Sequence, residues 1–193
     1  MTNRREFLQA AAVLTSTPLL NRMAFAGSGT AVSLDAVIYD KRHRQACEFA
    51  ARAGLLGAAL RPIQADITDL WQDELRGRWQ ARPAATVGLT ERPALFLLER
   101  LAWDHGLRVV FEAEHVPDGQ AKVVHRIIRS GDTELALKLA AAGRDWPYTL
   151  ADSMIAGTHA TTRDYHPTNT AMAGYPDEPV KLYSWIIAPR KTA

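Results

Sequence analysis

The chain has 193 residues, a formal net charge of +2 and 47% hydrophobic residues, which fits one globular domain of ordinary size. Its single cysteine, Cys47, excludes an internal disulfide, a thiolate zinc site, an iron–sulfur cluster and covalent haem attachment, because each of these needs more than one cysteine. Cys47 lies in a predicted helix, so we interpret it as a buried, unreactive thiol. A mixed disulfide with another chain is the alternative.

The first 26 residues have the pattern of an export signal. Residues 2–8 read Thr-Asn-Arg-Arg-Glu-Phe-Leu, and an interrupted apolar run continues to residue 20. That run falls short of the roughly 20 predominantly apolar residues that span a bilayer. A basic start, an apolar middle and the small-x-small end Ala24-Phe25-Ala26 are typical of a cleaved secretory segment. An uncleaved anchor or an amphipathic helix is the alternative.

The paired arginines followed by Phe-Leu resemble a twin-arginine (Tat) signal peptide. The resemblance implies cleavage after Ala26 and delivery of an already folded protein to the bacterial periplasm. Many proteins exported in this way carry a cofactor, or travel with a partner that carries one. The resemblance therefore makes a larger exported protein, such as a redox enzyme, a candidate partner.

Without its first 26 residues the chain is electrically neutral. That segment holds three arginines and one glutamate, so 20 basic and 20 acidic residues remain. A nucleic-acid-binding protein is expected to keep a basic excess, which makes this function class improbable here. A near-neutral surface is compatible with a protein that works inside a complex, and we expect no membrane span in the mature form.

Hydrophobic periodicity divides the rest of the chain into alternating strands and helices. A linker over 27–34 precedes the first strand. The helix after the third strand is apolar nearly all round, so we expect it to be buried on several sides or covered by a partner. The predicted strands cover 36–39, 58–64, 84–87, 107–115, 121–129 and 180–188, and the predicted helices cover 42–53, 68–79, 91–105 and 133–142.

This element order predicts a single α/β domain over residues 35–193. We expect three layers, with helices on both faces of a mostly parallel sheet and an added antiparallel hairpin. Residues 144–179 show no clear periodicity and contain several prolines, so they are predicted to form a long irregular C-terminal arm.

Familiar phosphate-binding and nucleophile motifs are missing from the sequence. There is no Gly-x-Gly-x-x-Gly after the first strand, no Gly-x-x-x-x-Gly-Lys-Ser/Thr, and no Gly-x-Ser-x-Gly. These absences argue against a dinucleotide dehydrogenase, a P-loop NTPase and a typical α/β-hydrolase.

Polar residues follow the predicted parallel strands, where ligands bind in open α/β sheets. Asp40 follows the first strand, and Asp66, Thr68 and Asp69 follow the second. Thr90 follows the third and is placed to cap the next helix. Converging carboxylates would bind a hard cation or act as an acid–base pair. The alternative is that these residues only cap helices and shape turns.

The predicted hairpin offers a second candidate site. If 118–119 (Asp-Gly) forms a two-residue turn, Glu112 lies opposite His125, and Glu114 shares their face of the sheet. His115 then points to the other face. A cross-strand Glu–His pair can act as an acid–base pair or supply metal ligands, and it can equally be a structural pair.

Residues of the irregular arm form a third candidate. His159, Arg163 and His166 lie within eight residues of each other, and an arginine with a histidine can hold an anionic ligand. The alternative is a hydrogen-bonded surface coil or an arm that binds a partner.

Two functions from different classes remain. The first is a periplasmic accessory or structural subunit of an exported redox enzyme, with no cofactor of its own. The second is a small periplasmic enzyme, or a ligand- or metal-binding protein, that uses the strand-end aspartates or the Glu112/His125 pair. An exported carrier or chaperone for a cofactor is a variant of the first. We expect no cofactor, and a divalent metal stays open as an alternative.

Overall fold

The structure is a computed structural model that describes residues 33–119, 122–129, 132–155 and 180–189. The export signal therefore lies outside the described residues. Six strands are present in the described residues: β1 (Leu34–Asp40), β2 (Leu60–Ile63), β3 (Ala85–Thr90), β4 (Leu107–Pro117), β5 (Val123–Arg129) and β6 (Leu182–Pro189).

Helices connect most of these strands. A helical segment after β2 contains a π-helical turn (Trp71–Leu75) between two short α-helices. The α-helices are α1 (Arg44–Leu55), α2 (Thr68–Leu70), α3 (Arg76–Ala81), α4 (Arg92–Asp104), α5 (Thr133–Ala142) and α6 (Trp146–Ile155), and a 3₁₀ turn (Gly143–Asp145) joins the last two.

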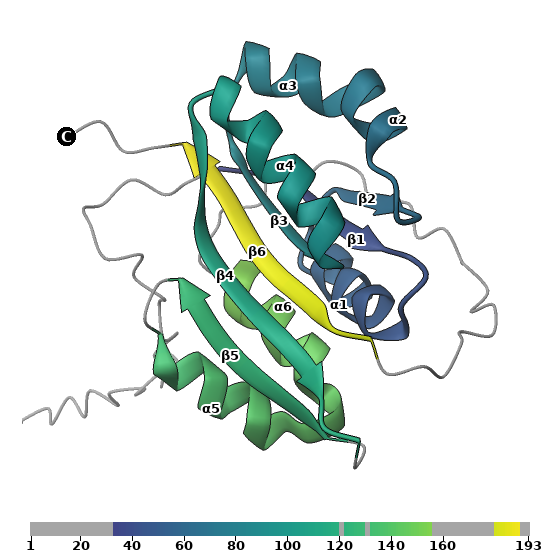
Figure 1. Ribbon diagram of the computed structural model, residues 1–193, viewed down its shortest axis with the longest axis vertical. Helices are drawn as coiled ribbons and strands as arrows, with labels where there is room; N and C mark the ends of the chain where they lie inside the picture. The colour runs from purple at the N-terminus through teal and green to yellow at the C-terminus, as the bar shows by residue number, and fades with distance from the viewer. Residues whose placement is uncertain (1–32, 120–121, 130–131, 156–179, 190–193) are drawn as a thin grey trace, which may run out of the picture.

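The strands form one mixed sheet in the order β2-β1-β3-β6-β4-β5. β1 pairs in parallel with β2 and with β3, whereas β6 pairs antiparallel with both β3 and β4. β5 adds the antiparallel edge strand expected from the hairpin. Helices cover both faces, so the predicted three-layer α/β fold is confirmed (Figure 1).

The two faces of the sheet bury separate apolar cores because side chains alternate along each strand. In β1, Val37 belongs to a first core beneath α1, α5 and α6, and the next residue, Ile38, belongs to a second core beneath α3 and α4. Trp79 of α3 is buried in the second core.

A glycine of β3 makes room for one of the two indole rings of the second core. A Cβ atom at Gly88 would lie 2.2 Å and 2.5 Å from ring carbons of Trp185. Gly88 pairs with Trp185 across β3 and β6, and the indole Nε1 donates a hydrogen bond to Thr90 Oγ1 at 3.1 Å. This contact ties the end of β3 to β6.

The apolar helix α4 is buried on one face only. Phe96, Leu97 and Trp103 lie on its outer side with 46%, 48% and 43% of their surfaces exposed. The guanidinium of Arg100 stacks over the rings of Phe96 and Trp103. Of the two expectations for this helix, burial on several sides is wrong in the described structure. None of the described helices is long and apolar enough to cross a membrane.

Two predicted boundaries need correction. Leu34, placed in the linker, is the first residue of β1. Residues 146–155, placed in the irregular arm, form α6, which buries Trp146, Leu150 and Met154 against the first core. Pro147 obscured this helix, but a proline in the first turn removes no internal hydrogen bond. Residues 156–179 of the predicted arm lie outside the described residues.

Candidate functional site at the carboxyl edge of the sheet

The helices that follow β1 and β3 diverge to opposite faces of the sheet. α1 packs on the first core and α4 on the second, so the carboxyl ends of β1 and β3 flank a topological switch point (Figure 1). In open α/β sheets the crevice at this point is the usual place for a ligand. Asp40 ends β1, and Glu91 directly follows β3.

Asp40 is the buried centre of the site. Its side chain is completely buried and accepts hydrogen bonds from Arg42 Nε at 3.0 Å and from Arg42 Nη2 at 2.6 Å. The backbone N–H of Arg42 adds a third bond at 3.1 Å. The side-chain hydrogen bond to Asp40 raises the pKa of Arg42, which therefore stays charged. The prediction that Asp40 lies at a site is consistent with this placement.

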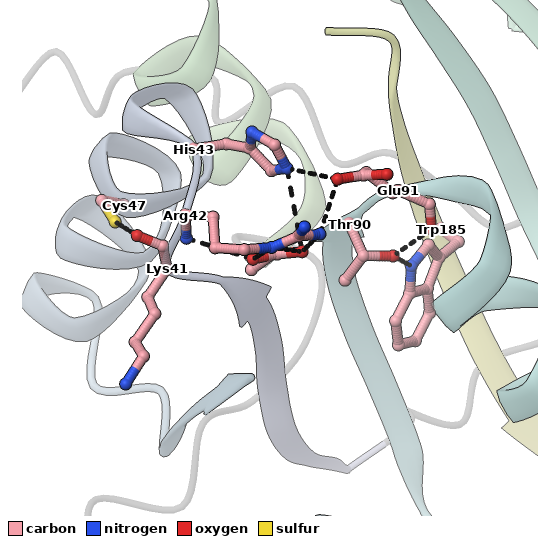
Figure 2. A network of polar contacts seen from close by, with 8 residues as sticks. Lys41, Arg42, His43, Cys47, Thr90, Glu91 and Trp185 are labelled. Carbon is pink, nitrogen blue, oxygen red and sulfur yellow. Dashed lines mark hydrogen bonds and ion pairs between the residues drawn. The ribbon is translucent and has the colours of Figure 1, made fainter. Parts of the chain in front are cut away.

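Glu91 and His43 complete the group. Arg42 Nη2 also donates to Glu91 Oε1 at 2.5 Å, and His43 Nε2 lies 2.9 Å from the same oxygen. The distance from His43 Nε2 to Asp40 Oδ2 is 3.8 Å. Figure 2 shows that the second ring nitrogen of His43 points away from Glu91. Asp40, His43 and Glu91 each offer one ligand atom, and these atoms all lie within 4.8 Å of one another.

Thr90 hydrogen-bonds to the backbone of Glu91 and does not cap α4. It is fully buried at the end of β3, and its hydroxyl donates to the backbone oxygen of Glu91 at 3.1 Å while accepting from Trp185. The N-cap of α4 is Glu91, which makes no side-chain capping bond. The predicted cap at Thr90 is therefore wrong, and its hydroxyl holds the chain that carries Glu91.

The polar residues after β2 serve a local turn. Asp66 Oδ1 accepts hydrogen bonds from the backbone N–H of Thr68 at 2.8 Å and from its hydroxyl at 2.7 Å. The hydroxyl bond from Thr68 lowers the pKa of Asp66. Asp69 is exposed in the first turn of α2. In the part of the chain that the structure describes, neither aspartate belongs to a group able to hold a metal.

The predicted register of the hairpin is wrong. His115 pairs with His125, and Glu112 pairs with Arg129. The strands end at a wider loop, closed by hydrogen bonds between Asp118 and Lys122, so Asp-Gly is not a two-residue turn. The shift is an odd number of residues, and it therefore moves His125 to the other face of the sheet, away from Glu112.

Glu112 forms ion pairs with arginines on the face that α4 covers. Its carboxylate is buried and contacts Arg92 and, at 3.3 Å, Arg129. Arg129 also pairs with Glu99 of α4 at 3.2 Å. Glu114 on the same face pairs with Arg126 at 3.0 Å. These compensated pairs hold α4 on the sheet, so Glu112 pairs with arginines and not with His125 as the predicted register required.

The observed register places the buried His115 opposite the partly buried His125, a pair that the sequence analysis did not predict. His115 Nδ1 lies 2.7 Å from His125 Nδ1, and His115 Nε2 lies 2.8 Å from the hydroxyl of Ser184. The ring of His115 stacks on Trp146 of α6, with centroids 4.5 Å apart. Burial lowers the pKa of His115 well below its usual value and lowers the pKa of His125 to about 4. Both rings are therefore neutral at neutral pH.

The remaining predicted site residues, His159, Arg163 and His166, lie outside the described residues. Comparison with known proteins adds no assignment. No family model matches the chain, and neither curated proteins nor solved structures give a match.

Proposed function

We propose that this chain binds a divalent transition-metal ion through Asp40, His43 and Glu91. The observation that carries the proposal is the convergence of Asp40 Oδ2, His43 Nε2 and Glu91 Oε1 at the switch point of the sheet, with their ligand atoms within 4.8 Å of one another. An imidazole with two carboxylates suits zinc, manganese or iron(II). The buried hydrogen bonds of Asp40 and Thr90 hold the two strand ends that carry the carboxylates.

Three protein ligands favour a reactive site over a structural one. Structural zinc sites use four protein ligands, whereas catalytic sites keep a position for water or substrate. A divalent ion in such a position lowers the pKa of its bound water and polarises a carbonyl or phosphoryl oxygen. We therefore propose metal-assisted hydrolysis as the reaction class.

Metal titration of the purified full-length chain tests the proposal. After chelator treatment and dialysis, isothermal calorimetry with Zn²⁺ or Mn²⁺ should give one site per chain. His43→Ala and Glu91→Gln should each weaken binding at least about tenfold. Glu74→Gln is the matched control, because Glu74 pairs with Arg61 away from the site. Unchanged binding in the His43 and Glu91 variants would contradict the assignment.

We also propose that the protein reaches the periplasm through its twin-arginine segment. This proposal is supported by the motif Arg4-Arg5-Glu6-Phe7-Leu8, which directly precedes an apolar run. Changing Arg4 and Arg5 to lysine should leave an uncleaved precursor in the cytoplasm, as measured by cell fractionation and immunoblotting. Normal export and cleavage of that variant would refute the proposal.

A second candidate function is that of an accessory subunit of a larger exported protein, such as a redox enzyme. The half-exposed apolar side of α4, formed by Phe96, Leu97 and Trp103, favours it. Purification from a native envelope extract should then recover a stoichiometric partner with the unsubstituted chain. Phe96→Ser with Leu97→Ser should lose it, while Leu137→Ser on α5, where Leu137 is 71% exposed, should retain it. A clean monomer would argue against this candidate.

A further inference from the structure

The metal site proposed above already contains a positive charge. We infer that Arg42 is a tethered counter-cation that a divalent metal displaces, and that the displaced guanidinium then helps the metal to bind an oxyanion ligand such as a phosphate or carboxylate. This inference rests on the proposed function and adds to it a loading mechanism and a class of ligand.

The first step is that Arg42 and the metal compete for the same oxygens. Arg42 Nη2 lies 2.6 Å from Asp40 Oδ2 and 2.5 Å from Glu91 Oε1. A metal bonded to both oxygens at roughly 2.0–2.2 Å lies close to the place that this nitrogen occupies. The two cations cannot share it, so binding of the metal requires the guanidinium to leave.

The second step is that Arg42 can leave whereas Asp40 cannot. The side chain of Arg42 is 35% exposed and belongs to the connection between β1 and α1, but the Asp40 side chain is 0% exposed at the end of a central strand. Arg42 belongs to neither apolar core, so its side chain can rotate into water, where arginine keeps its charge.

The third step is the balance of charge. The two carboxylates and Arg42 carry charges that sum to −1, and a bound divalent ion changes the sum to +1. In the described residues, Arg42 makes ionic contacts only with Asp40 and Glu91. Once the metal has neutralised both carboxylates, the arginine has lost its partners beside an open coordination position. An oxyanion can bind to the metal and also accept hydrogen bonds from the guanidinium, which binds such groups bidentately.

Calorimetry on the full-length chain separates this inference from the proposed function. Arg42→Gln should bind Zn²⁺ at least about tenfold more tightly than the unsubstituted chain, because the competing charge is gone, and Arg42→Lys should fall between them. Arg78→Gln is the matched control, since Arg78 pairs with Asp35 at the amino end of β1. Equal or weaker binding by Arg42→Gln overturns the inference and leaves the metal site standing. Absence of binding in every form overturns both.

The oxyanion step has its own measurement. The unsubstituted chain should bind inorganic phosphate, and acetate more weakly, only when Zn²⁺ is present, and Arg42→Gln should lose at least about tenfold in this affinity while keeping the metal. Phosphate binding that is independent of Zn²⁺ or of Arg42 overturns this step.

A nuclear magnetic resonance measurement needs no substitution. The Nε–H signal of Arg42, held by Asp40, should shift and exchange faster with water when Zn²⁺ binds. An unchanged signal in the Zn²⁺-loaded chain overturns the displacement.

Discussion

Lowering the pH should destabilise the protein through the buried His115 and its partly buried neighbour His125. The folded protein holds the pKa of His125 at about 4, whereas an unfolded histidine has its ordinary value of 6.5. Above pH 6.5 both states bind no proton at this site, so the stability is fully present. Between pH 6.5 and pH 4 the unfolded state binds more protons, and stability falls as the pH falls through that window.

The size of the loss follows from the same two values. For His125 alone, the linkage relation gives a ceiling of about 2 kcal/mol between pH 7 and pH 5. The ring is partly open to solvent, which screens the effect, so we expect about 1 kcal/mol. Burial lowers the pKa of His115 as well, and it adds to the loss in the same direction.

Urea unfolding at pH 7, 6 and 5 measures this loss, in a range where most carboxylates remain ionised. The free energy of unfolding should decline for the unsubstituted chain and decline less for His125→Gln, whose amide can still bond to His115. His105→Asn is the matched control, because it removes a histidine that packs against Trp71 and Trp79 instead. Parallel declines in the chain and in His125→Gln would refute the reasoning.

Three further predictions concern the sheet and its edges, each measured by urea unfolding beside the metal titration. Gly88→Ala should lower the free energy of unfolding by about 1–3 kcal/mol, because the added Cβ collides with Trp185. A variant as stable as the unsubstituted chain would refute this contact. Glu112→Gln should destabilise by about 1–3 kcal/mol, because two arginines lose a buried carboxylate, and it should leave metal affinity unchanged. Asp66→Ala should lower stability slightly and also spare metal binding; weaker metal binding would place Asp66 at the site.

The carboxyl edge was predictable where a general rule of the fold applied. The rule that ligands bind beyond parallel strand ends identified Asp40 from the sequence. It does not identify Glu91, because this residue falls in the predicted helix over 91–105. His43 and Arg42 lie 48 and 49 residues from Glu91, and a single sequence contains no signal that two such loops converge.

The hairpin shows a different limit. The apolar residues of β5 come in adjacent pairs, Val123–Val124 and Ile127–Ile128, so both faces of the strand carry apolar side chains. The apolar pattern therefore cannot choose between the two registers. In the folded chain, the hydrogen bonds between Asp118 and Lys122 close the wider loop and so fix the register. An incorrect prediction of the turn therefore gave the wrong cross-strand partner for both Glu112 and His125.

The two candidate functions both involve α4. The chain enters α4 at Glu91, a proposed metal ligand, and the outer side of the same helix carries Phe96 and Trp103. Arg129 links Glu99 of α4 to Glu112 of the sheet, so the helix is held on the sheet by ion pairs as well as by its apolar face. A partner that covers α4 would therefore contact the element that positions Glu91. A metal site and a subunit interface are thus compatible in this chain.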